Sequence, residues 1–291
     1  MLGLLRRHLR MGIGGLMLAI LLLGLLLGHW VNRAKEQARA VAAVKASGGW
    51  VRFADEFAMG PVNVPPGNAL WKPGWGKLVP NKGPILPDRL RRWIGDEYFR
   101  EVVHVSTFVD LQKLSASAPG LNRPPLDDML RALENQRGIR TLQLGGDTLT
   151  GKGLASVAKL TDLRELFLWW AGGVDDAGVA RIGHLPRLRV LDISLSPITD
   201  EGVGHLADLP ALEELSLQGK KFTDRSLKHL ARAKRLKLLF LRSDTSEFTD
   251  VGLEHLAGLK DLQQLGLQGA SLTKEGREKL VKAIPGLLIL P

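Results

Sequence analysis

The chain has 291 residues, 40 Lys and Arg against 30 Asp and Glu, and a formal net charge of +10. It contains no cysteine, which excludes disulfides, Cys-ligated zinc, iron–sulfur clusters and a cysteine nucleophile. With 45% hydrophobic and 24% charged residues, the composition is that of a folded chain, and the length allows one or two domains.

The positive charge is concentrated near the N-terminus. Residues 1–31 carry three Arg and no acid, and residues 32–100 carry twelve bases and six acids. Residues 101–291 carry 25 bases and 24 acids, so most of the chain is nearly neutral. A polynucleotide-binding protein would carry the excess on its folded body, so this distribution predicts no nucleic-acid partner.

An apolar segment from Met11 to Val31 follows a basic tail at residues 1–10 and contains no Lys, Arg, Asp or Glu. As a helix it would span roughly 31 Å, the thickness of a hydrocarbon core, with Trp30 at its interface. We therefore predict a single transmembrane helix over residues 11–31 that anchors the chain in the lipid bilayer. The alternative is a cleaved signal peptide, but the run is long and the nearest A-x-A, Ala38–Ala40, lies well past its end.

The membrane orientation follows less directly, because bases flank the apolar segment on both sides. The tail is short and rich in Arg, which favours a cytoplasmic N-terminus and predicts that the rest of the chain is extracytoplasmic. Gly24 and Gly28 form one G-x-x-x-G pair on the segment, a spacing that allows two helices to approach closely in a weak homodimer.

Residues 32–100 are predicted to hold a juxtamembrane helix and a Pro/Gly/Trp-rich region. Good helix formers run to about Lys45, Gly48 and Gly49 end that helix, and residues 50–53 alternate like a strand. Residues 60–87 contain seven Pro, which excludes regular elements there. Trp71 and Trp75 lie in this region, either as an aromatic binding loop or, as we favour, as rings that fix the loop in place.

Residues 101–138 are predicted to form an N-terminal cap for the segment that begins at residue 139. Val103-His104-Val105 is expected to be a strand, and residues 115–125 an inserted loop. Apolar residues at helical spacing then predict a helix from Leu126 to about Gln136.

Residues 139–291 repeat one two-part pattern six times, followed by a terminal strand. The pattern Leu-x-x-Leu-x-Leu places apolar side chains on one face of a short strand. Its central leucines are 24 to 26 residues apart, at Leu142, Leu166, Leu191, Leu215, Leu239 and Leu265. An apolar residue and then Thr or Asp begin the second part, at Leu149, Val174, Ile198, Phe222, Phe248 and Leu272. A Thr or Asp there, such as Thr199 and Asp200, is placed to cap a following helix, and stacked units share one core.

This pattern resembles the leucine-rich-repeat family, in particular its class of 24–26 residues with an I-T-D-x-G-L block, as in F-box-associated and many bacterial repeat proteins. The N-terminal half is similar to bacterial single-pass membrane-anchored leucine-rich-repeat proteins of unknown function, through the anchor, the helix at residues 32–34 and the Gly-Asp-Glu-Tyr-Phe segment at 95–99. The resemblance implies an α/β right-handed solenoid with parallel strands on the concave face and helices on the convex face.

The repeats also depart from the family pattern. The Asn or Cys that bonds the turn backbone in the family is replaced here by Asp147, Ser196, Lys220 and Ala270, so a regular buried polar ladder at that position is not expected. Repeat 2 carries Trp169-Trp170-Ala-Gly-Gly and is one residue longer, and repeat 5 has a longer segment at 242–247.

The outward strand positions predict where a partner binds. Most are small or polar, but Phe167 and Phe240 occupy one column, with Asp192 and Ser216 between them and with Trp169 and Arg242 further along their strands. Two apolar anchors around a polar floor are typical of protein-binding hot spots. The alternative is that the N-terminal region or the 242–247 segment covers these rings.

Catalytic motifs are absent from the sequence: it has no P-loop, no H-E-x-x-H and no G-x-S-x-G. His205, His229 and His255 recur at one helix position, which we interpret as an exposed repeat position and not a metal site. The basic run from Lys220 to Lys237 lacks interleaved aromatics, so we interpret it as a solvated face.

Taken together, these features predict a non-enzymatic protein, without cofactor or metal, that binds a protein partner through its concave face at a membrane. The alternatives are a structural spacer of the cell envelope without a discrete ligand, or an adaptor of the F-box type. The adaptor is disfavoured because an apolar span, and no F-box-like three-helix segment, precedes the repeats.

Overall fold

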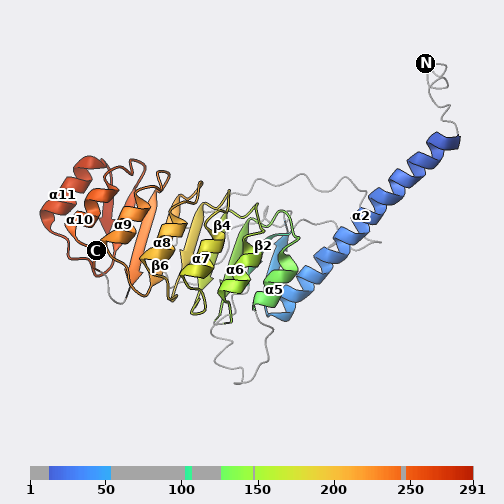
Figure 1. Ribbon diagram of the computed structural model, residues 1–291, viewed down its shortest axis with the longest axis horizontal. Helices are drawn as coiled ribbons and strands as arrows, with labels where there is room; N and C mark the ends of the chain where they lie inside the picture. The colour runs from blue at the N-terminus through green and yellow to red at the C-terminus, as the bar shows by residue number, and fades with distance from the viewer. Residues whose placement is uncertain (1–12, 54–101, 107–125, 147, 244–246, 291) are drawn as a thin grey trace, which may run out of the picture.

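The computed structural model describes residues 13–53, 102–106, 126–146, 148–243 and 247–290 (Figure 1). Its strands are β1 (Trp50–Phe53), β2 (Val102–Ser106), β3 (Thr141–Gly145), β4 (Glu165–Trp169), β5 (Val190–Ile193), β6 (Glu214–Gly219), β7 (Leu238–Ser243), β8 (Gln264–Leu267) and β9 (Leu288–Leu290). Its helices are α2 (Ile13–Ala46), α5 (Leu126–Leu133), α6 (Gly151–Val157), α7 (Asp176–Ile182), α8 (Asp200–Leu206), α9 (Asp224–Leu230), α10 (Asp250–Leu256) and α11 (Lys274–Ala283).

The strands form one nine-stranded sheet in chain order. β1 and β2 pair antiparallel, and every later neighbour pair is parallel. Helices α5 to α11 follow one another along one side of this sheet, so the body is an elongated stack of strand–helix units (Figure 1). This confirms the predicted α/β repeat architecture, whereas the antiparallel pair at its start was not predicted.

One continuous apolar core runs between the strand layer and the helix layer. The central leucines of the strands are fully buried: Leu142, Leu166, Leu191, Leu215, Leu239 and Leu265. The apolar residues that open the second part of the first five units are also buried, including Phe222 and Phe248, and Leu272 of the sixth is partly buried. A side-chain period of two along each strand and a matching apolar stripe on each short helix produce this core, and no unit could bury both faces alone.

The first strand–helix pair covers the N-terminal end of the core. β2 pairs with β3 so that the buried Val105 lies beside Leu142, as a cap strand should. α5 buries Leu126, Met129, Leu130 and Leu133 against the same end of the core. The predicted inserted loop at 115–125 and the Pro/Gly/Trp-rich segment at 60–87 lie outside the described residues.

α2 is a single helix of 34 residues that contains both the predicted apolar span and the predicted juxtamembrane helix. Its C-terminal turns pack against α5 and β1 and bury Ala40, Val41 and Val44, while its N-terminal half projects away from the repeats (Figure 1). Within the described part of the chain, no helix combines the length and the apolar character needed to cross a membrane. The predicted transmembrane helix is therefore not confirmed.

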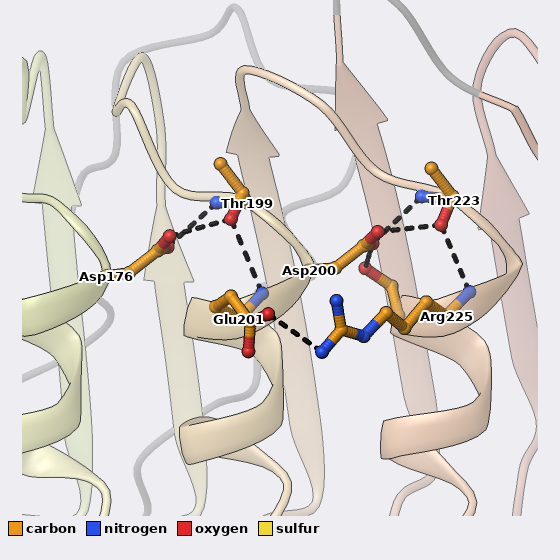
Figure 2. A network of polar contacts seen from close by, with 7 residues as sticks. Asp176, Thr199, Asp200, Glu201, Thr223 and Arg225 are labelled. Atoms are coloured by element: carbon orange, nitrogen blue, oxygen red, sulfur yellow. Dashed lines mark hydrogen bonds and ion pairs between the residues drawn. The ribbon is translucent and has the colours of Figure 1, made fainter.

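A ladder of Asp–Thr contacts joins helix starts of neighbouring repeats (Figure 2 shows two of these contacts). Thr199 donates its backbone N–H to Asp176 Oδ1 at 2.8 Å and its hydroxyl to Asp176 Oδ2 at 2.6 Å. Asp200 holds Thr223 in the same way, at 2.9 and 2.6 Å. Equivalent contacts join Asp127 to Thr150, Asp224 to Thr249 and Asp250 to Thr273. The Thr caps its own helix, as predicted, but the Asp holds the following repeat.

This ladder explains the glycine of the I-T-D-x-G-L block. A Cβ atom at Gly202 would overlap Asp176 Oδ1 of the preceding repeat, and one at Gly252 would overlap Asp224 Oδ1. Repeat 4 has Ser226 at this position instead, and its hydroxyl donates to Asp200 (Figure 2). The position therefore requires either no side chain or a small donor that bonds the carboxylate.

One junction in the ladder has no Asp–Thr contact. Between α6 and α7, Gly151 occupies the Asp position and Asp175 replaces the capping Thr. The two backbones approach closely here, because a Cβ atom at Gly151 would lie 3.1 Å from Gly178 Cα. Asp175 instead accepts a hydrogen bond from Gly178 N at 2.9 Å within its own helix.

We expect Gly202→Ala to lower the free energy of unfolding by about 1–3 kcal/mol, because the new methyl group displaces Asp176 from Thr199. Gly204→Ala, two residues further along α8, is the matched control. Its Cβ would make a 3.4 Å contact with the His229 ring, so we expect a change of about 0.5 kcal/mol or less. Urea denaturation measures both variants, and equal losses would contradict the role of the ladder.

Candidate functional site

Four of the predicted site residues lie in one column on the sheet side away from the helices, which we call the strand face. Phe167 pairs in register with Asp192, Asp192 with Ser216, and Ser216 with Phe240. This is the register that the leucine spacing predicts. Trp169 pairs with Gly145, and Arg242 pairs with Gln218. Both residues lie two residues further along their strands than the phenylalanines of this column.

The two phenylalanines of the column differ in their exposure. Phe167 is 2% exposed, and its ring stacks on Trp169 with centroids 5.8 Å apart and planes 25° apart. Phe240 is half-buried and its ring lies over Gly266 of β8, because a Cβ atom at Gly266 would overlap it. Arg242 is exposed. The exposed side of the predicted site is therefore its Phe240 and Arg242 end, and the assignment itself stays a prediction.

Asp192 and Ser216 form the polar floor between the rings. Burial raises the pKa of the Asp192 carboxyl to about 6, and a hydrogen bond from Ser216 partly offsets this. Ionised Asp192 is thus held in a site that solvates it poorly. Such a carboxylate gains free energy when a partner supplies a donor or a positive charge.

Two further carboxylates, which the sequence pattern did not indicate as site residues, lie in the adjacent column at Glu165 and Glu214. Thr141 donates to Glu165 at 3.0 Å, while burial raises the pKa of Glu165. Burial, helped by Glu213 and Glu165, raises the pKa of Glu214 to about 7. Among the described residues, the buried Oε2 of Glu214 has no hydrogen-bond partner. Two outward Glu residues in one column, on strands β4 and β6 with Val190 of β5 between them, were the available signal, but their desolvation depends on the folded sheet.

Glu213, which precedes Glu214 in the chain, has an environment that favours its ionised form. Arg189 donates to both of its oxygens at 2.8 Å, and Lys237 lies 2.9 Å from Oε2. These bonds lower the pKa of Glu213 to about 2. Arg189 and Lys237 are thus bonded to Glu213, and Glu214 Oε2 has no hydrogen-bond partner among the described residues.

Trp170 and Leu195 were also not predicted as site residues. They follow β4 and β5 at equivalent positions and have left-handed backbones, with φ of 53° and 54°. The same position holds glycine in three other repeats, where Gly146 and Gly269 also have positive φ and Gly219, at the end of β6, does not. Their side chains are nevertheless exposed by 40% and 48%. The extra length of repeat 2 was the only sequence signal for this feature.

The repeat geometry defines the class of protein. Units of 24 to 26 residues, each with a short parallel strand, a turn and a helix around one leucine core, are leucine-rich repeats. The described residues therefore have the architecture of a leucine-rich-repeat solenoid.

Likenesses to known proteins are found among solved structures. No family model matches the sequence, and no curated protein matches it. Among solved structures, an internalin from Listeria monocytogenes is 18% identical over 55% of this chain and 49% of its own, with a TM-score of 0.41. A leucine-rich-repeat protein of Leptospira interrogans is 21% identical over 55% and 45%, with a TM-score of 0.38. This chain spans about half the length of each, and these likenesses say nothing further about its activity.

Glu214 predicts a pH-dependent effect on stability. Its folded pKa of about 7 exceeds the unfolded value of about 4.3, so the stability that its protonated form contributes is full below pH 4.3 and is lost as pH rises through 7. We expect Glu214→Gln to raise the free energy of unfolding at pH 8 and to have a smaller effect at pH 5.

Denaturant titrations at both pH values measure this effect. Asp261→Asn, an exposed change in the turn before β8, is the control and should shift stability little at either pH. An equal effect of Glu214→Gln at the two pH values would contradict the environment described here.

Proposed function

We propose that this chain is a non-enzymatic, membrane-anchored protein that binds a protein partner through its strand face. The observation that carries the proposal is a set of side chains at the strand face whose burial or backbone conformation is energetically unfavourable. Asp192 and Glu214 are carboxylates with raised pKa values, and Trp170 and Leu195 are exposed apolar residues on left-handed backbone. None of them contributes to the leucine core. Residues that are energetically unfavourable and that do not pack in the core are typical of functional surfaces.

The partner contact is expected to centre on the exposed parts of this face. Trp170 lies beside β3, since a Cβ atom at Gly145 would be 3.9 Å from its ring, and it follows Trp169, whose ring stacks on Phe167. Phe240 and Arg242 provide the second contact, across Asp192 and Ser216. Aromatic and Arg side chains around a desolvated polar centre are the residue types that dominate binding energy at interfaces.

Helix α2 supports the anchoring part of the proposal. Leu18, Ile20, Leu21, Leu22 and Leu25 are all at least half exposed, with Ile20 on the opposite side of the helix from the other four, and residues 13–31 contain no charged side chain. A helix that is apolar on every side is stable only when its surroundings are apolar as well. This half of α2 projects from the repeats, so we propose that it lies in a bilayer, with residues 1–10 cytoplasmic and the repeats extracytoplasmic (Figure 1). Gly24 and Gly28 have open space around them for a second helix.

Phe240→Ala tests the strand face. With the full chain as bait in solubilised membranes, we expect a stoichiometric partner to be captured by the unchanged chain and lost by the variant. The melting temperature should fall by only a few degrees, because Phe240 is half-buried and outside the core. Val251→Ala removes an apolar side chain from the opposite side, where it is 63% exposed, and should keep the partner. No captured partner, or equal loss with both variants, would favour a spacer without a ligand.

The proposed topology has its own test. A reporter active only in the cytoplasm, fused after Pro291, should be silent while the fusion stays in the membrane fraction through alkaline extraction. An active reporter would show that the orientation is the reverse of the proposed one. Release of the fusion by alkali would contradict the proposed membrane anchor.

A further inference from the structure

The solvent side of α9 and the turn after it is strongly basic. Arg225, Lys228, Arg232 and Lys234 follow one another along it. At the first three of these positions, α8 has Glu201, Gly204 and Asp208, and α10 has Val251, Glu254 and Gly258. The repeat pattern does not require bases here, so they are specific to this unit.

Two of these four bases are paired with acids of the preceding repeat, and the acid on the other side is directed away. Arg225 pairs with Glu201 at 2.8 Å, and Arg232 pairs with Asp208 at 3.1 Å, both on the α8 side (Figure 2 shows the first pair). On the α10 side, Glu254 is directed to Lys279 of α11, 3.9 Å away. Lys228 has no ion pair with any residue that the structure describes.

A hollow of about 660 Å³ lies between α9 and α10 at this place. It is lined by Asp224, Arg225, Lys228, His229, Arg232 and His255. Asp224 is the one acid among them, and both of its oxygens are occupied by Thr249 in the ladder. Lys234 Nζ lies at the end of α10, 3.1 Å from where a Cβ atom at Gly258 would be. The absence of a side chain at Gly258 leaves room there.

The pKa of His229 reflects burial and the positive charges that line the hollow. Burial, together with the nearby Arg232 and Arg225, lowers its pKa, and its Nε2 is a buried atom without a hydrogen-bond partner in the described structure. The ring lies against Gly204 and so forms the α8-side wall. The positive charges therefore act on each other and on His229, and an anion in the hollow would relieve that repulsion.

We propose that this hollow binds an anion that carries phosphate groups. Lys228 and the guanidinium N–H groups that Glu201 and Asp208 leave unused on Arg225 and Arg232 are donors of the kind that matches phosphate oxygens, and the volume is that of a small-molecule site. The lining residues include no aromatic side chain for base stacking, which argues against a nucleic-acid strand. The hollow lies toward the opposite end of the stack from α2, away from the proposed anchor (Figure 1). A soluble phosphate compound therefore fits better than a headgroup of the same bilayer.

Calorimetric titration of tripolyphosphate into the full chain, held in zwitterionic nanodiscs, tests the proposal. We expect saturable one-to-one binding that Lys228→Gln weakens about ten-fold, because one charge-assisted hydrogen bond is lost. Lys282→Gln, an exposed change of the same charge on α11, should leave the affinity within about two-fold. Both variants should melt at the temperature of the unchanged chain, and a sodium chloride titration at equal ionic strength should give no saturable heat.

A second arm distinguishes the source of the phosphate. Phosphatidylglycerol vesicles are mixed with the same nanodiscs and tested for co-flotation. Binding of these vesicles that depends on Lys228, without tripolyphosphate binding, would identify a lipid headgroup as the phosphate source. Absence of binding in both arms, or binding that Lys228→Gln and Lys282→Gln weaken equally, would overturn the site.

Discussion

The contact between one Asp carboxylate and the Thr of the next helix start is the interaction on which this stack depends. In Asp176–Thr199, for example, the carboxylate accepts from both the backbone N–H and the hydroxyl of the Thr. It thereby satisfies donors at a helix terminus, fixes the distance between neighbouring helices and requires Gly202 to have no side chain. A short helix of seven residues would be marginal alone, so its position is set by this contact and by the shared leucine core.

Fixed spacing between the helices keeps the strands in register, and this creates the columns of the strand face. Residues that are 24 or 25 positions apart in the sequence become neighbours, which brings Phe167, Asp192, Ser216 and Phe240 into one line. The outward side chains contribute little to the core, so their identity is free to vary between repeats. Departures such as Trp170, where three other repeats have glycine, do not serve the leucine core, and this is why the proposed binding face includes them.

The two sides of the solenoid carry different chemistry on the same scaffold. The strand face holds desolvated carboxylates such as Glu214 beside aromatic rings. The helix side around α9 holds bases such as Lys228 around an acid-poor hollow. These surfaces are separated by the thickness of the core, so the proposed protein-binding face and the proposed anion site lie on opposite sides of the stack.

The sequence by itself determined the repeat, its register and the buried leucines, because a strict period of 24 to 26 residues allows few alternative stackings. It also indicated Thr199 as a helix cap, since capping is local. Only the tertiary structure decided that Asp176 bonds the following repeat, that Phe167 is buried and that Glu214 is desolvated. These properties depend on which side chains of other repeats approach each group, and sequence spacing does not specify those distances.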